Sequence, residues 1–501
     1  MSVKRMYYDA AVIYYGDNSS KVNLREIGQI SLNTAVIGQK KSPNVTQCLI
    51  DEKTVVFDSH WLTNQPLFVF VGRGKLIVSH ELNVILSLAG TELVASKAAF
   101  RNFLKRGTMQ INYCPFENVK TVMPGDCTTI ARQNPNIEVY RQTRPPGVAL
   151  DPNEIEPVLY RHISKLTEGR NVALALSGGI DTTLIASLYA KMSPGKKITG
   201  FTAHTRRGRD LEYARKVAKK LEIELVEVTL PDDAEALNLH RAMTASSLSP
   251  MPFSGVTIGY SAVCRKARTM GFDAILDGSG SDTFFGGNYG IHGKYWALDK
   301  RQIGNSERVQ KYLDWVGENE LVNAEIIKTI KDGELTYDFV EKMYEETTRT
   351  LAFSWIYRYC AIAKAQGIDI LMPYFHERIA NFILNDLDQF FIDGISKVPL
   401  RRLLNKSVGH EIAYRRDVQG LRFPVRDLLK AHRPEINRTS RNFTYGLSFL
   451  WPFELTLIIN GVFGKGRYTR LYALAVLADA IEKSLKKQRE SEPVSTSWTT
   501  G

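Results

Sequence analysis

The stretch Val172–Thr183 reads VALALSGGIDTT and joins an apolar segment to a glycine turn. Its first residues, Val172 to Leu176, carry only apolar side chains, which is typical of a strand buried on both faces of a parallel sheet. Apolar residues then recur at helical spacing, at Leu184, Ile185 and Leu188. The sequence therefore predicts a strand, a glycine loop and a helix in direct succession.

The loop between this strand and this helix has the composition of a phosphate-binding site. The unpaired backbone N–H groups at the start of a helix, together with the helix dipole, favour an anion. Gly178 and Gly179 permit a close backbone approach, and Ser177 and Thr182 add hydroxyl groups. Asp181 is suited to hold a hard cation beside the phosphates. For a lone SGG tripeptide, the alternative is an ordinary glycine turn before a capped helix.

A second glycine loop, Leu276–Gly287, reads LDGSGSDTFFGG and follows a short apolar run. Four glycines and two acids directly after a strand are typical of a site for an anion and a metal. If both strands belong to one parallel sheet, Asp181 and Asp282 lie at the same edge, where a divalent ion fits between them and the phosphates. The alternative for Asp282 is a helix cap or an Asx turn.

The chain has two regions of different pattern. Residues 1–143 alternate short β-like runs with turns, which predicts a β-rich domain. The proline-bearing segment Thr143–Gly147 is the predicted linker. In residues 144–486 strands alternate with helices, which predicts an α/β fold with a doubly wound parallel sheet and a helical C-terminal part. The polar residues 487–501 are predicted to form a disordered tail.

Composition limits the classes of function. The chain has 501 residues, 44% hydrophobic and 24% charged, which is typical of a soluble globular protein with two or three domains. We find no run of ~18 apolar residues and no signal peptide, so a cytoplasmic enzyme without a membrane partner is expected. Five cysteines without CxxC pairs indicate neither a disulfide framework nor a zinc site. The net charge of +12 is spread along the chain, which disfavours nucleic acid and favours the phosphate groups of a ligand or an acidic partner.

Both glycine loops resemble those of a known family. SGGIDTT resembles the SGGxDS or SGGxDT loop of the ATP pyrophosphatases (PP-loop enzymes), and LDGSGSDTFFGG resembles the LSGEGADELFGG of class B asparagine synthetases. Weaker similarities occur at Asn64–Leu67, Ile77–Leu82, Met123–Gly125, Gly367–Phe375 and Tyr414–Pro424. The resemblance implies an N-terminal glutaminase-like domain of the Ntn type before a PP-loop synthetase domain. It also implies ATP and Mg²⁺, with AMP and pyrophosphate as products.

The resemblance assigns roles to individual residues. Asp181 and Asp282 are the implied metal ligands. The implied ATP- or pyrophosphate-binding residues are Leu176, Ser177, Gly178, Gly179, Asp181, Thr182, Thr202, Gly278, Ser279 and Gly280. Asp369 corresponds to a family glutamate implicated in proton transfer, and a helix cap or surface acid is the alternative for it. Arg415 and Arg416 stand near a family lysine, and arginine there can stabilise charge but stays protonated.

Three departures from the family narrow the expected function. Ser2 stands where the family has the cysteine that hydrolyses glutamine, so no glutaminase activity is expected. Val418 stands at the position of the family lysine, and Leu371 replaces an arginine of the acceptor pocket. The missing cysteine and the altered acceptor pocket resemble the lasso-peptide macrolactam synthetase and β-lactam synthetase branch, whereas Val418 and Leu371 also suggest a degenerate relative that only binds ATP. In that branch the first domain is vestigial, and the amine already belongs to the substrate.

The leading hypothesis is an ATP-dependent, AMP-forming amide ligase that closes the macrolactam ring of a lasso-type precursor peptide. Its implied partners are that precursor peptide and a leader-peptide protease. The first alternative is an asparagine synthetase-like or β-lactam-forming enzyme with a small substrate. The second alternative is a catalytically degenerate scaffold that binds ATP, and the retention of both aspartates argues against it.

Overall fold

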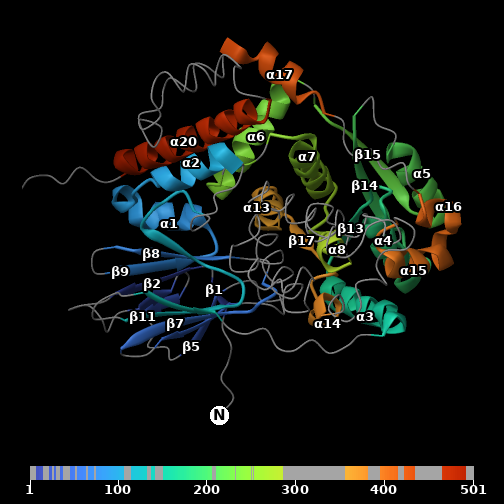
Figure 1. Ribbon diagram of the computed structural model, residues 1–501, viewed down its shortest axis with the longest axis horizontal. Helices are drawn as coiled ribbons and strands as arrows, with labels where there is room; N and C mark the ends of the chain where they lie inside the picture. The colour runs from blue at the N-terminus through green and yellow to red at the C-terminus, as the bar shows by residue number, and fades with distance from the viewer. Residues whose placement is uncertain are drawn as a thin grey trace, which may run out of the picture.

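The computed structural model describes the chain in two parts, which Figure 1 shows side by side. The described residues of the second part are 151–205, 210–231, 233–249, 251, 253–285, 356–381, 395–415, 423–434 and 465–491. Those of the first part are 7–8, 10–14, 22–24, 27–29, 34–37, 46–50, 53–63, 66–72, 75–106, 114–131 and 137–141. The predicted linker Thr143–Gly147 lies outside these residues.

The first part contains two six-stranded sheets stacked on each other. One sheet has the order β1 (Tyr7–Tyr8), β5 (Thr34–Ile37), β6 (Thr46–Ile50), β7 (Thr54–Ser59), β11 (Asp126–Ala131) and β12 (Ile137–Arg141). The other has the order β10 (Val119–Val122), β8 (Leu67–Val71), β9 (Lys75–Ser79), β2 (Ala10–Tyr14), β3 (Val22–Leu24) and β4 (Ile27–Gln29). The prediction of a β-rich first domain is therefore confirmed, whereas its likeness to a glutaminase stays a prediction.

Burial along the strands shows how these two sheets are covered. In β7 and β11 buried and partly exposed residues alternate, as expected when only one face of a sheet is packed. In β8 and β9 nearly every residue is buried. The second face of this sheet is covered by α1 (Leu82–Ala89), the 3-10 helix η2 (Gly90–Glu92) and α2 (Lys97–Arg106).

The long C-terminal helix α20 (Lys465–Ser491) joins the two parts. It packs against α1 and α2 of the first part and against α6 (Ala234–Ser247) of the second. Leu474, Leu477 and Ile481 share a buried cluster with Phe70 and Phe103. Because α20 continues to Ser491, the predicted start of a disordered tail at 487 falls inside a helix, which corrects that boundary.

The second part is built on a five-stranded parallel sheet. Its order is β15 (Glu224–Thr229), β14 (Thr199–His204), β13 (Val172–Ala175), β16 (Ala274–Leu276) and β17 (Asp369–Leu371). Each neighbouring pair is parallel, so the predicted doubly wound sheet is confirmed. The central strand β13 is mostly buried because both of its faces are covered, as its apolar sequence indicates.

Helices cover both faces of this sheet (Figure 1). One layer contains α3 (Ile155–Thr167), α4 (Ile180–Met192), α5 (Asp210–Lys220) and α15 (Val398–Val408). The other contains α7 (Gly255–Thr269) and α13 (Tyr357–Ala365), with α6 packed against them. Shorter helices are η3 (Pro152–Glu154), α8 (Ser281–Phe284), α14 (Glu377–Asn381), α16 (His410–Ala413) and α17 (Val425–Ala431). Among the described residues, no helix is long and apolar enough to cross a membrane.

The order of the strands creates a switch point beside β13. From β13 the chain continues to β14 and β15 on one side and then returns to β16 on the other. The loops that follow β13 and β16 therefore leave neighbouring strands at the same carboxyl edge of the sheet. Ligands of doubly wound folds bind at such an edge.

Candidate functional site

The loop after β13 is held in shape by its own hydroxyl groups. Gly179 is the N-cap of α4, and its N–H donates to Oγ of Ser177 at 3.2 Å. Oγ1 of Thr182 lies 3.1 Å from Oγ of Ser177 and accepts the N–H of Ser177 at 3.3 Å. Gly178 has a φ of +71°, and a Cβ there would lie 2.5 Å from the backbone nitrogen of Ala214. Glycine is thus required at 178 by conformation and by space, and the loop fixes its hydroxyls where a helix N-terminus favours an anion.

The loop after β16 has a similar internal scaffold. Oδ1 of Asp277 accepts the N–H of Ser279 at 2.8 Å. Gly280 has a φ of +100° and precedes α8, which carries Asp282 in its first turn. A Cβ on Gly278 would lie 2.8 Å from the backbone carbonyl carbon of Asp181. The two loops are therefore packed backbone to backbone, as the pairing of their parent strands predicts.

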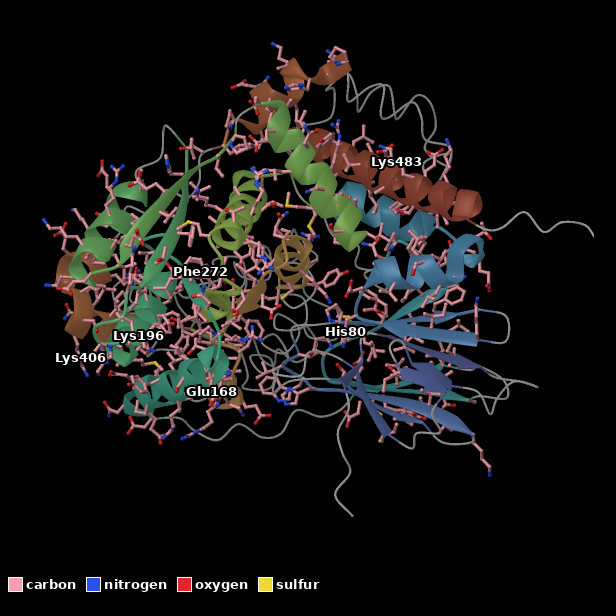
Figure 2. All side chains as sticks on the ribbon, turned by 180° about the vertical axis from the view of Figure 1, so that it is seen from behind. His80, Glu168, Lys196, Phe272, Lys406 and Lys483 are labelled. Carbon is pink, nitrogen blue, oxygen red and sulfur yellow. The ribbon has the colours of Figure 1, made fainter. Side chains whose placement is uncertain are left out.

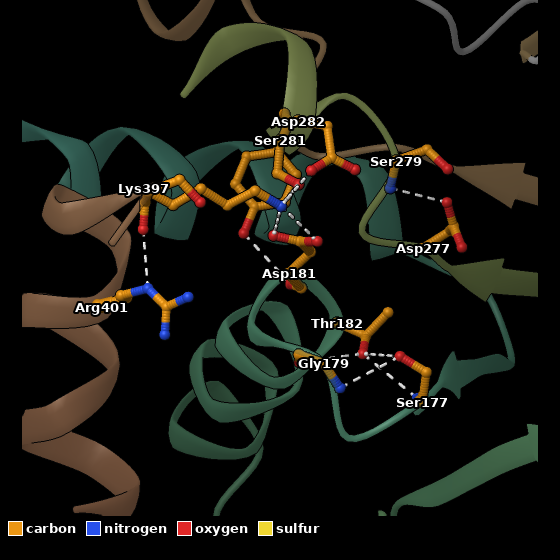
Figure 3. Close-up of polar contacts among 12 residues, drawn as sticks. Ser177, Gly179, Asp181, Thr182, Asp277, Ser279, Ser281, Asp282, Lys397 and Arg401 are labelled. Carbon is orange, nitrogen blue, oxygen red and sulfur yellow. Dashed lines mark hydrogen bonds and ion pairs between the residues drawn. The ribbon is translucent and has the colours of Figure 1, made fainter. Parts of the chain in front are cut away.

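Lys397 lies between the two predicted metal ligands. Its Nζ is 2.7 Å and 2.8 Å from the two carboxylate oxygens of Asp181 and 2.5 Å from Oδ1 of Asp282. The hydroxyl of Ser281 lies 3.4 Å from the same ammonium, and the hydroxyl of Tyr374 donates to the backbone carbonyl of Asp181 at 3.2 Å. Figure 3 shows both aspartates pointing at this one nitrogen from the two loops. The two aspartates thus lie close together, as the sequence predicts, and the ammonium of Lys397 lies between their carboxylates.

Burial shifts the pKa values of three charged side chains at this site. Burial raises the pKa of Asp181; the ammonium of Lys397 opposes that rise, and Asp282 adds to it. Burial lowers the pKa of Lys397, but the two carboxylates outweigh burial and raise it above its usual value. Burial also raises the pKa of Asp277. Because Lys397 stays protonated, the site brings two carboxylates together around one buried ammonium.

A cavity of about 350 Å³ opens beside the two loops, between the sheet and α7. Apolar side chains of Phe201, Val263 and Ile275 form part of its wall. Tyr260 and Tyr359 also line it, and their rings stack at 4.3 Å between centroids. An apolar, aromatic wall with a polar rim is typical of a site for a flat organic ligand.

Most of the predicted nucleotide-binding residues reach this cavity. Those that line it are Leu176, Ser177, Gly179, Thr182, Thr202 and Ser279. Gly178, Gly278 and Gly280 instead set the shape and close approach of the loops. The predicted group is therefore assembled around one space at the carboxyl edge of the sheet.

Arg415 also lines the cavity and is almost fully buried, with 5% exposure. Its guanidinium carbon lies 4.1 Å from the centre of the Tyr213 ring, a cation–π contact that fixes its orientation. Arg401 donates to the backbone carbonyl of Arg415 at 3.4 Å. Arg416 and Val418 lie outside the described residues.

The structure places Asp369 outside this cavity. Asp369 begins β17 and pairs in register with Ala274, at the amino edge of the sheet. Its carboxylate accepts a hydrogen bond from Arg170 at 2.8 Å. It lines a separate cavity of about 290 Å³ between the first part of the chain and α13. Asp369 therefore lies outside the cavity that the other described site residues share, and its role in proton transfer stays a prediction.

Sequence reasoning missed several residues of the site. Lys397 follows no recognisable loop motif and lies 216 positions from Asp181, so only the fold brings it close. Tyr213, Tyr260 and Tyr359 come from helices whose sequence pattern indicates only packing. Asp277 could have been found, because it directly follows β16 at the edge where the loops meet.

Comparison with protein families identifies one match. The model of the family described as asparagine synthase matches residues 154–441, which is more than half of the chain. A probable glutamine-hydrolysing asparagine synthetase from Dictyostelium discoideum is 25% identical over 174 residues. That alignment covers 30% of this chain and 30% of the relative.

Comparison with solved structures gives remote similarities. The NH3-dependent NAD synthetase from Campylobacter jejuni is 15% identical, with 40% of this chain and 96% of that chain covered and a TM-score of 0.24. The NMN synthetase from Francisella tularensis is 16% identical, with 40% and 94% covered and a TM-score of 0.22. TM-scores this low do not support transfer of any site.

Proposed function

Because the chain belongs to the asparagine synthase family, we propose that it is an ATP-dependent ligase that joins a substrate carboxylate to an amine. The observation that carries the proposal is the convergence of Asp181, Asp282 and Lys397 beside the cavity at the carboxyl edge. Three kinds of group meet there. The carboxylates can bind a cation, the hydroxyls and helix N–H groups can bind phosphates, and the apolar wall can bind a nucleotide base.

In the proposed complex the adenine of ATP occupies the cavity against Tyr260 and Tyr359. Its phosphates extend to the N–H and hydroxyl groups of the loop Ser177–Thr182. Arg415, held by Tyr213, faces the cavity and is suited to bind an anionic oxygen. This orientation is supported by the position of the polar residues, which lie where the sheet ends and the loops begin.

The carboxylates fit the magnesium ion that the family implies. Asp181 and Asp282 supply hard oxygen donors that converge on one point, within 2.5 to 2.8 Å of a single nitrogen. These two residues would hold the ion, which when bound would neutralise charge on the leaving pyrophosphate. The ion's preference for oxygen ligands matches this donor set.

The proposed reaction has two steps. An oxygen of the substrate carboxylate attacks the α-phosphorus of ATP, the bond to the β-phosphate oxygen breaks, and pyrophosphate leaves with the bonding electrons. The amine then attacks the acyl carbon, AMP leaves, and the amine loses a proton. Loop N–H groups and Lys397 stabilise the charge that develops on pyrophosphate, and such electrostatic stabilisation usually contributes most to catalysis. Because Asp369 lies at the amino edge, we expect another group to accept the proton.

The finer proposal is macrolactam ring closure of a lasso-type precursor peptide. It is supported by one sequence feature, Leu371 in place of an acceptor-pocket arginine. Leu371 is 6% exposed and packs in the core around β17. An apolar residue at this position disfavours a small acidic acceptor such as aspartate, because it offers no counter-charge.

The test is ATP–pyrophosphate exchange by the purified chain with Mg²⁺. A synthetic precursor peptide is compared with aspartate plus ammonia, and Asp282→Asn is the control for contaminating activity. Exchange with the peptide, followed by a product lighter by one water, would support ring closure. Exchange only with aspartate would favour the asparagine synthetase-like alternative. Absence of exchange with every carboxylate would favour the scaffold that only binds ATP.

A further inference from the structure

The ammonium of Lys397 occupies the point on which the two predicted metal ligands converge. The Lys397 side chain is 7% exposed, and its Nζ contacts both carboxylate oxygens of Asp181 and one of Asp282. The side chains of Asp282 and Asp181 are 59% and 25% exposed, so solvent and ions reach the acid pair although the ammonium is buried. A divalent ion bound by the same oxygens would lie within contact distance of the ammonium, and the two cations repel each other.

The backbone of Lys397 indicates that its position is maintained at a cost. Lys397 has φ of +58° and ψ of 34°, a left-handed conformation that is rare for residues other than glycine. It is also the N-cap of α15, where the helix dipole disfavours a cation. Strained residues of this kind persist where the surroundings determine them, commonly at functional sites. Here the surroundings are the two carboxylates.

We propose that Lys397 is a built-in substitute for the metal ion, and that its ammonium leaves Asp181 and Asp282 for the phosphates when metal-bound ATP enters. The inference rests on the proposed function only in taking ATP as the ligand that attracts the ammonium. In the nucleotide-free protein Lys397 compensates one of the two negative charges of the acid pair and keeps the two loops together. Free metal binds weakly in that state, because it must displace the ammonium from the two carboxylates, which are its anionic partners among the described residues.

The exchange becomes favourable when nucleotide and metal arrive together. The phosphates of ATP offer new anionic oxygens to the ammonium, and the metal neutralises the vacated carboxylates. Lysine suits this exchange, because its four-carbon stem carries a point charge that can move between partners, unlike the fixed fork of arginine. A cation contacts both acids before and after the exchange, so the acid pair does not lack a cationic partner at either stage.

The test uses Lys397→Met, which keeps the length of the side chain and removes its charge. Lys406→Met is the matched control, because Lys406 is an exposed lysine of the same helix and lies at the outer surface of the molecule (Figure 2). Binding of Mn²⁺ alone, without nucleotide, is measured by electron paramagnetic resonance. Lys397→Met is expected to bind Mn²⁺ at least tenfold more tightly than wild type, and Lys406→Met is expected to match wild type.

The second measurement is affinity for nucleotide. Lys397→Met is expected to bind Mg-ATP at least tenfold more weakly, while its affinity for adenosine, which has no phosphates, stays unchanged. An increase in metal affinity together with a decrease in nucleotide affinity is what the exchange of ammonium for metal predicts. A lysine with a purely structural role would lower both affinities, and an Mn²⁺ affinity in Lys397→Met equal to or below that of wild type overturns the proposal.

Two controls keep the outcome interpretable. If Lys397→Met unfolds without metal, Mg²⁺ alone must raise its melting temperature while leaving that of wild type unchanged, and failure to do so overturns the proposal. The Mn²⁺ measurement needs no turnover. Wild type that lacks ATP–pyrophosphate exchange therefore contradicts the proposed ligase, whereas unaltered Mn²⁺ binding in Lys397→Met contradicts the exchange of cations.

Discussion

Gly278 and Asp181 touch through their backbones, since a Cβ atom on Gly278 would lie 2.8 Å from the carbonyl carbon of Asp181. This contact sets the spacing of the two loops and so of the two carboxylates that contact Lys397. No flexible side chain is available to give way, because the nearest atoms belong to the main chain. The separation of Asp181 from Asp282 thus depends on the absence of a side chain at position 278.

Replacement of Gly278 by alanine should separate the loops. We expect a loss of about 1–3 kcal/mol in the free energy of unfolding from overpacking, together with at least a hundredfold loss of pyrophosphate release. Gly169→Ala is the control, because a Cβ at position 169 would meet no atom within 4 Å and the φ there is +65°. Backbone strain alone should therefore lower the stability of this variant and leave its activity unchanged. Equal activity in Gly278→Ala and wild type would contradict the role of this contact.

The buried imidazole of His240 should make stability depend on acid pH. Burial lowers the pKa of His240 to about 4, although its Nε2 lies 2.7 Å from the carbonyl of Met251. An unfolded histidine titrates near 6.5, so the unfolded state binds more protons between these values. The contribution of His240 to the free energy of unfolding is therefore fully present above about pH 6.5. It is lost as pH falls towards 4, by up to ~3 kcal/mol.

Urea unfolding at pH 7 and pH 4.5 measures this dependence. In His240→Phe the drop between the two pH values should be smaller than in wild type by about 2–3 kcal/mol. Lower stability of the variant at both pH values would reflect its lost hydrogen bond and does not bear on the comparison. An identical drop in both proteins would show that His240 is not the titrating group.

Arg358 offers a test of buried charge. Its side chain is 7% exposed, its Nε has no hydrogen-bond partner among the described residues, and burial lowers its pKa to about 10. Arg358→Met should therefore raise the free energy of unfolding by about 1–4 kcal/mol. Arg401→Met is the matched control and should lower it, because Arg401 donates to the carbonyls of Ser396 and Ala413 at 2.8 Å. A loss of stability in Arg358→Met would contradict this reasoning.

Asp369 is expected to be dispensable for chemistry. Its carboxylate is 37% exposed and pairs with Arg170, so Asp369→Asn should cost at most ~1 kcal/mol after solvent screening. Both pyrophosphate release and amide formation should stay within about threefold of wild type, because the residue lies at the far edge of the sheet. Selective loss of amide formation would restore the proton-transfer role that the family resemblance implies.

The sequence was sufficient for features that depend on local pattern. The apolar run before Ser177 and the one before Asp277 predict buried strands, and parallel strands bring their carboxyl ends to one edge, so the meeting of Asp181 and Asp282 follows. Lys397 could not be predicted, because it reaches the loops only through the packing of α15 on α4. The position of Asp369 at the start of β17 could not be predicted, because a motif gives a position in the chain but not which end of a short strand that position occupies.

The central claim is that Asp181 and Asp282 form the cation and pyrophosphate site of an adenylating ligase. ATP–pyrophosphate exchange in Asp181→Asn and Asp282→Asn, with folding verified by circular dichroism, tests it most directly. Each variant should keep its secondary structure and lose at least a thousandfold in exchange rate, because preorganised charge usually contributes most to catalysis at such sites. Exchange within tenfold of wild type in either folded variant would contradict the account.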